Sequence, residues 1–132
     1  IIQNADINRL VIPSNITSFK SNYSIIDSKI DTLVIESDKI LFDYGLWIYN
    51  TQVNNFVCNS TYIKCDWSGA GFEDILYILA KSARMASNNS VFSVKFTFKK
   101  NAKAYEYYYG YRSIRNNIKN NYLDEHYDIT LV

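Results

Sequence analysis

The only histidine of the chain, His126, directly follows two carboxylates, Asp124 and Glu125. A histidine beside carboxylates can act as a general base, because its neighbours adjust its pKa. Catalysis would also require a nucleophile or a metal ion, and the spacing of the residues indicates neither. The nucleophile-elbow motif is also absent. We interpret His126 as a surface residue between a helix and a strand, and we predict no catalytic residue and no enzyme.

Two glycines, Gly69 and Gly71, precede a segment with helical spacing. Backbone N–H groups at such a helix start can bind a phosphate. The chain has neither the full dinucleotide fingerprint nor the Gly-Lys-Ser/Thr of a nucleotide-binding loop. Glu73 and Asp74 would also repel an anion there. We therefore interpret residues 68–71 as a hinge and predict no cofactor.

Two residue types that often bind metals occur in patterns that do not suit a metal ion. Cys58 and Cys65 are the only cysteines, and they lack the neighbours of a zinc site. We expect both in the hydrophobic core, with a single disulfide as the alternative if the protein is extracellular. Four aspartates between residues 27 and 43 do not match a calcium-binding EF-hand loop and are interpreted as solvated turn residues.

Charge is distributed unevenly along the chain, although the formal net charge is only +1. Residues 1–72 carry a net charge of −2, and residues 73–132 carry +3. All bases of the second part lie between Lys81 and Lys119, interleaved with phenylalanines and tyrosines. Bases and aromatic rings on a sheet can bind a phosphate backbone and stack nucleobases. Nucleic-acid binding is therefore the alternative function, and it would use Lys95, Lys99, Lys100, Lys103 and Arg115.

Periodicity predicts the elements that position these residues. Apolar residues follow helical spacing over residues 72–86. Residues 90–99 alternate between apolar and polar, which predicts a half-buried strand. A hairpin turn at residues 100–103 would lead into a return strand through the tyrosines, followed by a second helix from Arg112 to Tyr122. The last strand is expected over residues 127–132, so the second half is predicted as α-β-β-α-β.

The tyrosine-rich hairpin over residues 91–112 is the predicted binding surface. Tyrosine offers a large contact area with little loss of side-chain freedom and is enriched at protein interfaces. Its tyrosines cannot all be buried on one side of a strand, because successive side chains point to opposite faces. The predicted protein-binding residues are Tyr105, Tyr107, Tyr108, Tyr109, Tyr111 and Arg112.

The first half contains three similar stretches, residues 7–12, 30–35 and 53–58, at a constant spacing of 23 residues. Each contains a continuous apolar triplet, which suits a parallel strand buried on both faces. Pro13 directly follows the first triplet and should end that strand, because proline lacks a backbone N–H. A regular period predicts a solenoid whose core forms by stacking of copies. Three evenly spaced strands of an ordinary α+β domain are the alternative.

A resemblance to a known family lies in the first copy, Leu10-Val11-Ile12-Pro13-Ser14-Asn15-Ile16-Thr17-Ser18-Phe19. This segment resembles the leucine-rich repeat of the bacterial surface-antigen (BspA) type, which has a 23-residue period and an Ile-Pro-Ser after its strand. The resemblance covers residues 7–65, and the second copy has Glu36 in place of proline. It implies one short parallel strand per repeat, binding of a ligand or host protein, and a secreted or cell-surface location.

The sequence as a whole predicts an α+β protein with a β-rich, repeat-like half (residues 1–67) and an α+β half (residues 68–132), packed as one unit. Its predicted function is a non-enzymatic protein–protein interaction module. Within that class we expect either a surface-adhesion repeat fragment or a small inhibitor or immunity-type protein, which would be cytoplasmic. No apolar run approaches the roughly 18 residues that a membrane span needs. Because the chain begins with Ile1 rather than Met, we interpret it as a processed product or a piece of a longer chain.

Overall fold

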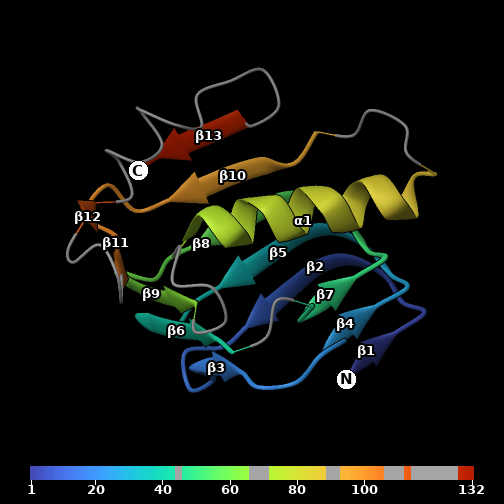
Figure 1. The fold of residues 1–132 in the computed structure, drawn as a ribbon, viewed down its shortest axis with the longest axis horizontal. Coiled ribbons are helices and arrows are strands. Elements are labelled where there is room, and N and C mark those ends of the chain that lie inside the picture. Colours follow the sequence, from blue (N-terminus) through green and yellow to red (C-terminus); the bar gives the residue numbers. More distant parts are fainter. Residues whose placement is uncertain (44–45, 66–71, 89–92, 106–111, 114–127) are drawn as a thin grey trace.

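The computed structural model describes residues 1–43, 46–65, 72–88, 93–105, 112–113 and 128–132. Within these ranges the strands form three sheets, in which nearly all neighbouring strands run parallel, around one hydrophobic core (Figure 1). A single described helix, α1 (Phe72–Ala86), packs against the same core. The fold is therefore dominated by parallel strands.

The three sheets are named A, B and C in the order in which the chain first enters them. Sheet A has the strand order β1 (Ile2–Gln3), β4 (Ile25–Ile26) and β7 (Ile48–Tyr49). Sheet B has the order β13 (Asp128–Leu131), β10 (Lys95–Phe98), β8 (Gln52–Cys58), β5 (Lys29–Ile35) and β2 (Asp6–Ile12). Sheet C has the order β12 (Arg112–Ser113), β11 (Lys103–Tyr105), β9 (Tyr62–Cys65), β6 (Lys39–Phe42) and β3 (Ser18–Phe19).

The 23-residue spacing of the sequence is the register between neighbouring strands. In sheet B, Ile7 pairs with Ile30 and Ile30 pairs with Val53. The same offset joins β1 to β4 and β4 to β7 in sheet A, and β3 to β6 and β6 to β9 in sheet C. The described residues up to Cys65 therefore form three stacked coils of a parallel β-solenoid, each coil giving one strand to each sheet.

The corner between sheets A and B depends on residues that tolerate a left-handed backbone. Asn4, Asp27 and Asn50 occupy this corner in successive coils, with φ angles of 53°, 52° and 45°. Asn and Asp adopt positive φ more readily than other residues with a side chain. The Asn50 side-chain amide also donates a 2.7 Å hydrogen bond to the Asp27 carboxylate. The corner is thus fixed by residue type and by a bond between coils.

A row of hydroxyl groups beside this corner connects the coils and ends at α1. The Ala5 N–H donates to the Ser28 hydroxyl at 3.1 Å, and the Ser28 N–H donates to the Thr51 hydroxyl at 3.2 Å. The Thr51 N–H in turn donates to the hydroxyl of Ser82, a residue of α1, at 2.8 Å. In the first and second coils, the accepting hydroxyl belongs to the next coil. In the third coil it belongs to Ser82, so α1 takes the place of a further coil at this point.

The interior consists of the inward-facing side chains of all three sheets together with one face of α1. Phe42 is fully buried, with its ring stacked on Phe19 at 5.4 Å and tilted against Trp47 at 4.7 Å between centroids. From the helix, the buried side chains include Ile75, Leu76, Leu79 and Ala83. Cys58 and Cys65 lie in the core with 1% and 2% exposure, as predicted.

The predicted α+β class with an α-β-β-α-β second half is wrong. The described residues contain mostly parallel strands in three sheets, and β10 and β11 are not a hairpin pair. β10 pairs in parallel with β8 in sheet B, whereas β11 pairs in parallel with β9 in sheet C. Residues 99–102 are a corner between two sheets, equivalent to the corners of the earlier coils. Local alternation identified the strand but not its long-range partners.

The remaining predicted elements have separate outcomes. The helix over residues 72–86 is confirmed, and a last strand forms over Asp128–Leu131. The predicted second helix is wrong where it begins, because Arg112 and Ser113 form β12, which pairs antiparallel with β11. The rest of that predicted helix and the hinge at residues 68–71 lie outside the described residues. No described helix is long and apolar enough to cross a membrane.

Candidate functional site: the outer face of sheet C

Strands β6 and β9 each present alternate side chains to the core and to solvent. Ile40, Phe42, Ile63 and Cys65 are buried, with exposures of 2% or less. The residues between them face outward, since neighbouring side chains of a strand point to opposite faces. We name these outward residues the sheet C face: Lys39 and Leu41 on β6, and Tyr62 and Lys64 on β9.

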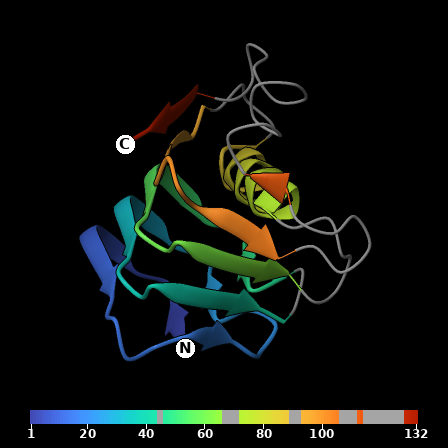
Figure 2. The same cartoon turned by 90° about the vertical axis from the view of Figure 1, so that its left-hand side faces the viewer.

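The sheet C face has a checkerboard arrangement set by the register of two parallel strands. Lys39 lies opposite Tyr62, and Leu41 lies opposite Lys64. Each base thus has an apolar or aromatic neighbour both along its strand and across to the next strand. The register continues onto β11, where Lys103 aligns with Tyr62 and Tyr105 with Lys64. Figure 2 shows β3, β6, β9 and β11 stacked in this order.

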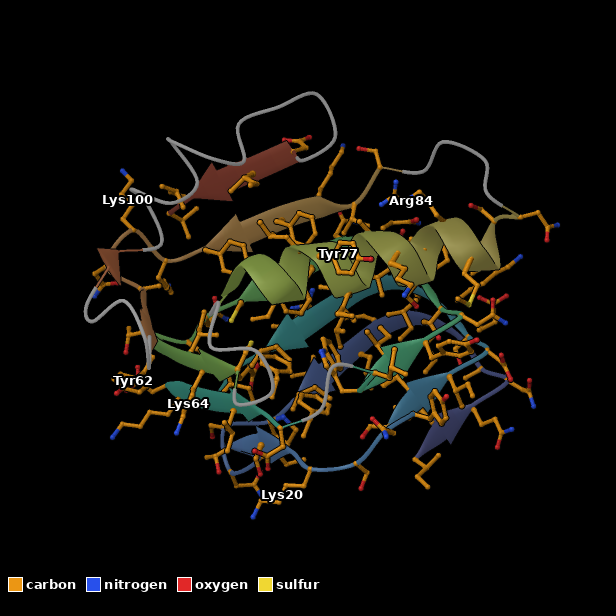
Figure 3. The ribbon with its side chains drawn as sticks, in the orientation of Figure 1. Lys20, Tyr62, Lys64, Tyr77, Arg84 and Lys100 are labelled. Carbon is orange, nitrogen blue, oxygen red and sulfur yellow. The ribbon has the colours of Figure 1, made fainter. Side chains whose placement is uncertain are left out.

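Tyr62 is the largest exposed side chain of this face. It is 37% exposed, and the Lys39 ammonium lies 5.8 Å from the centre of its ring. A cation at this distance from an aromatic face is attracted by the ring, by about 0.5–1 kcal/mol at an exposed site. Figure 3 places Tyr62 and Lys64 beside β9, whereas Tyr77 lies on α1. Lys39 and Tyr62 therefore place a cation beside an aromatic ring on the outer face of one sheet.

The described strands segregate charge by sheet. Those of sheet C carry four bases, Lys39, Lys64, Lys103 and Arg112, and no acid. Those of sheet B carry three bases and three acids, and those of sheet A carry no charge. The strands of sheet C are therefore basic despite the near-zero net charge of the chain, and two acids, Asp38 and Asp43, directly flank β6.

The outer face of sheet B offers a shallow groove of about 380 Å³, lined by Asp6, Asn8, Lys29, Asp31, Gln52 and Asn54 together with Ile7 and Ile30. Its polar groups bond one another. The Asn54 amide donates to the Asp31 carboxylate at 2.9 Å, and the Gln52 amide donates to the side-chain oxygen of Asn54 at 3.4 Å. Because both signs of charge alternate here, the groove has less electrostatic preference for a ligand than the sheet C face.

The predicted protein-binding residues lie in or next to sheet C as far as they are described. The backbones of Tyr105 and Arg112 belong to β11 and β12. Tyr107, Tyr108, Tyr109 and Tyr111 lie outside the described residues. The sequence predicted Tyr105 and Arg112 in a hairpin with β10. In the structure their strands belong instead to sheet C, which also contains Lys39 and Tyr62.

The residues predicted for nucleic-acid binding are divided between two sheets. Lys95 is exposed on the outer face of sheet B, where it pairs in register with Asn55 and Asp128. Lys99 and Lys100 lie in the corner between sheets B and C, and Lys103 begins β11 in sheet C. Arg115 lies outside the described residues. The fold therefore separates Lys95 from Lys103 rather than bringing them onto one strand face.

Among the described residues, the thiol of Cys58 is unsuited to act as a nucleophile. Burial raises the pKa of the Cys58 thiol to about 11. Hydrogen bonds with Ser60 lower this pKa, but the effect of burial is larger. A thiol with this pKa stays protonated at neutral pH and is a poor nucleophile. In the described part of the chain, no three His, Cys, Asp or Glu residues group as metal ligands would. His126, Asp124 and Glu125 lie outside the described residues.

Sequence reasoning missed Lys39, Leu41, Tyr62 and Lys64 as surface residues, although a signal was present. Residues 39–42 and 62–65 both alternate between outward and apolar inward positions. They also lie 23 residues apart, so the repeat that aligned the apolar triplets aligns these residues too. Extending the period beyond the triplets would have identified Lys39 and Tyr62 as neighbours.

Comparisons with protein-family models, with curated proteins and with solved structures find no match to this chain.

Proposed function

We propose that this chain is a non-enzymatic protein-interaction module that binds its partner through the sheet C face. The observation that carries the proposal is the exposed Tyr62 ring, which lies beside the Lys39 ammonium on a parallel sheet. Tyrosine is enriched among the residues that dominate binding energies. A side chain positioned on paired strands also loses little freedom on binding, which favours affinity.

Two forms of this function remain as proposals. A surface-adhesion fragment agrees with the resemblance of residues 10–19 to BspA-type repeats and with the 23-residue register of the coils. A small inhibitor or immunity-type protein would use the same face to block its partner. Both require the sheet C face to contact protein, so one experiment on that face bears on both.

Replacing Tyr62 by alanine is expected to weaken the complex with the native partner about tenfold or more, since truncation of a hot-spot tyrosine costs about 2 kcal/mol or more. The partner would be recovered with the intact protein from its source and purified, and the dissociation constant measured for each variant. Tyr77→Ala is the matched control, because Tyr77 is 50% exposed and also has a lysine ammonium, that of Lys81, 5.8 Å from its ring.

This control distinguishes the loss of a specific contact at Tyr62 from the general effect of removing an exposed tyrosine. Tyr77 is exposed on α1 and is not part of the sheet C face, so Tyr77→Ala should leave the dissociation constant unchanged within about twofold. Equal affinities of Tyr62→Ala and the unmodified protein, with both folded by circular dichroism, would remove the sheet C face from the interface.

A further inference from the structure

Resting on the proposed function, we infer that the partner docks on the sheet C face through an acidic segment in extended conformation, with apolar side chains beside its carboxylates. The occupant is thus a stretch of protein chain rather than a nucleic acid or a membrane. Three features of the face support this choice: the sign of its charge, the spacing of its bases, and the apolar surface between them.

The sign of the charge selects an acidic ligand. The described strands of sheet C contain bases and no acids, whereas those of sheet B balance the two. Complementary charge guides a partner to a surface and disfavours alternative orientations. Even with Asp38 and Asp43 at the ends of β6, the bases of sheet C outnumber the acids, so an acidic segment is drawn to sheet C more strongly than to sheet B.

The spacing of the bases suits an extended chain. Lys39 and Lys64 lie on neighbouring strands. Lys39 is opposite Tyr62, and Lys64 is two residues further along β9, so the two lysines occupy one diagonal of the checkerboard. Strands lie about 4.8 Å apart and rise about 3.3 Å per residue, so the two positions are roughly 8 Å apart. Carboxylates at alternate positions of an extended segment are separated by about 6.6 Å and point to the same side. Two flexible lysine side chains easily cover the difference.

Apolar surface between the bases distinguishes a peptide from a polyphosphate. Leu41 is half-buried and Tyr62 is exposed, and they occupy the other diagonal. Apolar side chains of a peptide can pack there while its carboxylates reach the lysines. A phosphate backbone binds best along a continuous row of bases. On the sheet C face the bases Lys39 and Lys64 form no continuous row, because they alternate with Leu41 and Tyr62.

The test uses a labelled synthetic peptide with glutamate at alternate positions and leucine and serine between them, titrated with the whole chain at low ionic strength. The double variant Lys39→Gln, Lys64→Gln should weaken binding roughly 3- to 30-fold, since each exposed ion pair contributes modestly. The control double variant Lys29→Gln, Lys95→Gln removes the same charge from sheet B, where both lysines are exposed. It should change affinity by less than about twofold.

Three results would overturn the inference. The first is no measurable binding of the peptide, and the second is an equal loss of affinity in the two double variants. The third is tighter binding of a single-stranded oligothymidylate than of the peptide, with the same dependence on Lys39 and Lys64, which would assign the face to nucleic acid. The proposed function has its own readout, which is the affinity for the native partner. If Tyr62→Ala lowers this affinity and the double variant Lys39→Gln, Lys64→Gln does not, the sheet C face is still the interface. The acidic segment would then be excluded.

Discussion

Leu33→Lys is expected to destabilise the protein by about 4 kcal/mol or more, a large part of the roughly 5–15 kcal/mol that stabilises a typical domain. Leu33 is fully buried in the middle coil, where it pairs in register with Leu10 on one side and Phe56 on the other. A lysine there would place an ammonium among apolar side chains without a partner. Urea denaturation followed by circular dichroism measures the loss, or shows that the variant is unfolded.

Thr32→Lys is the matched control for this prediction. Thr32 precedes Leu33 on the same strand and faces outward, where its hydroxyl contacts the Asp31 carboxylate. A lysine at position 32 stays in solvent beside a carboxylate and should change the free energy of unfolding by no more than about 1 kcal/mol. Similar losses in the two variants would contradict the assignment of inward and outward faces in β5.

Phe42→Ala is expected to lower the free energy of unfolding by about 3–5 kcal/mol, the usual effect of truncating a buried phenylalanine. Phe42 is fully buried, and its ring contacts those of Phe19 and Trp47. Its loss leaves a cavity where the first and second coils stack, since it aligns in register with Phe19. Tyr77→Ala, which removes a half-exposed ring from α1, should change this quantity by about 1 kcal/mol or less. A loss below about 1 kcal/mol in Phe42→Ala would contradict the stacked aromatic core.

Features with a short period were predictable from the sequence, and so was the 23-residue spacing. The helix over Phe72–Ala86 follows from its apolar face, and the end of β2 at Ile12 follows from Pro13. The spacing of the apolar triplets equals the register of sheet B, because stacked coils place equivalent residues side by side.

Long-range pairing was not predictable in the same way. Residues 95–98 alternate as a strand of a hairpin would, and β10 also buries Phe96 and Phe98 against the core. Nothing in that local pattern distinguishes an antiparallel neighbour eight residues later from a parallel neighbour about forty residues earlier. The structure selects β8, so Phe96 pairs with Phe56. The mistaken hairpin followed from assuming that sequential strands pair directly.

The candidate site illustrates the same limit. The sequence drew attention to bases and tyrosines in the second half, where they are most concentrated. The fold instead places Lys39 and Tyr62, which are 23 residues apart in the first half, in direct contact on sheet C. It also moves Lys95 to a different sheet from Lys103. When the chain passes through three sheets in turn, bases and tyrosines that are close together in the sequence therefore need not lie close together on the surface.

The most direct test of the account is amide hydrogen exchange of the whole chain with and without its purified native partner. Binding through the sheet C face predicts that exchange slows in peptides covering Lys39–Phe42 and Tyr62–Cys65 and stays unchanged in Lys29–Ile35 of sheet B and in α1. Slowed exchange confined to sheet B or to α1, with β6 and β9 unaffected, would contradict it.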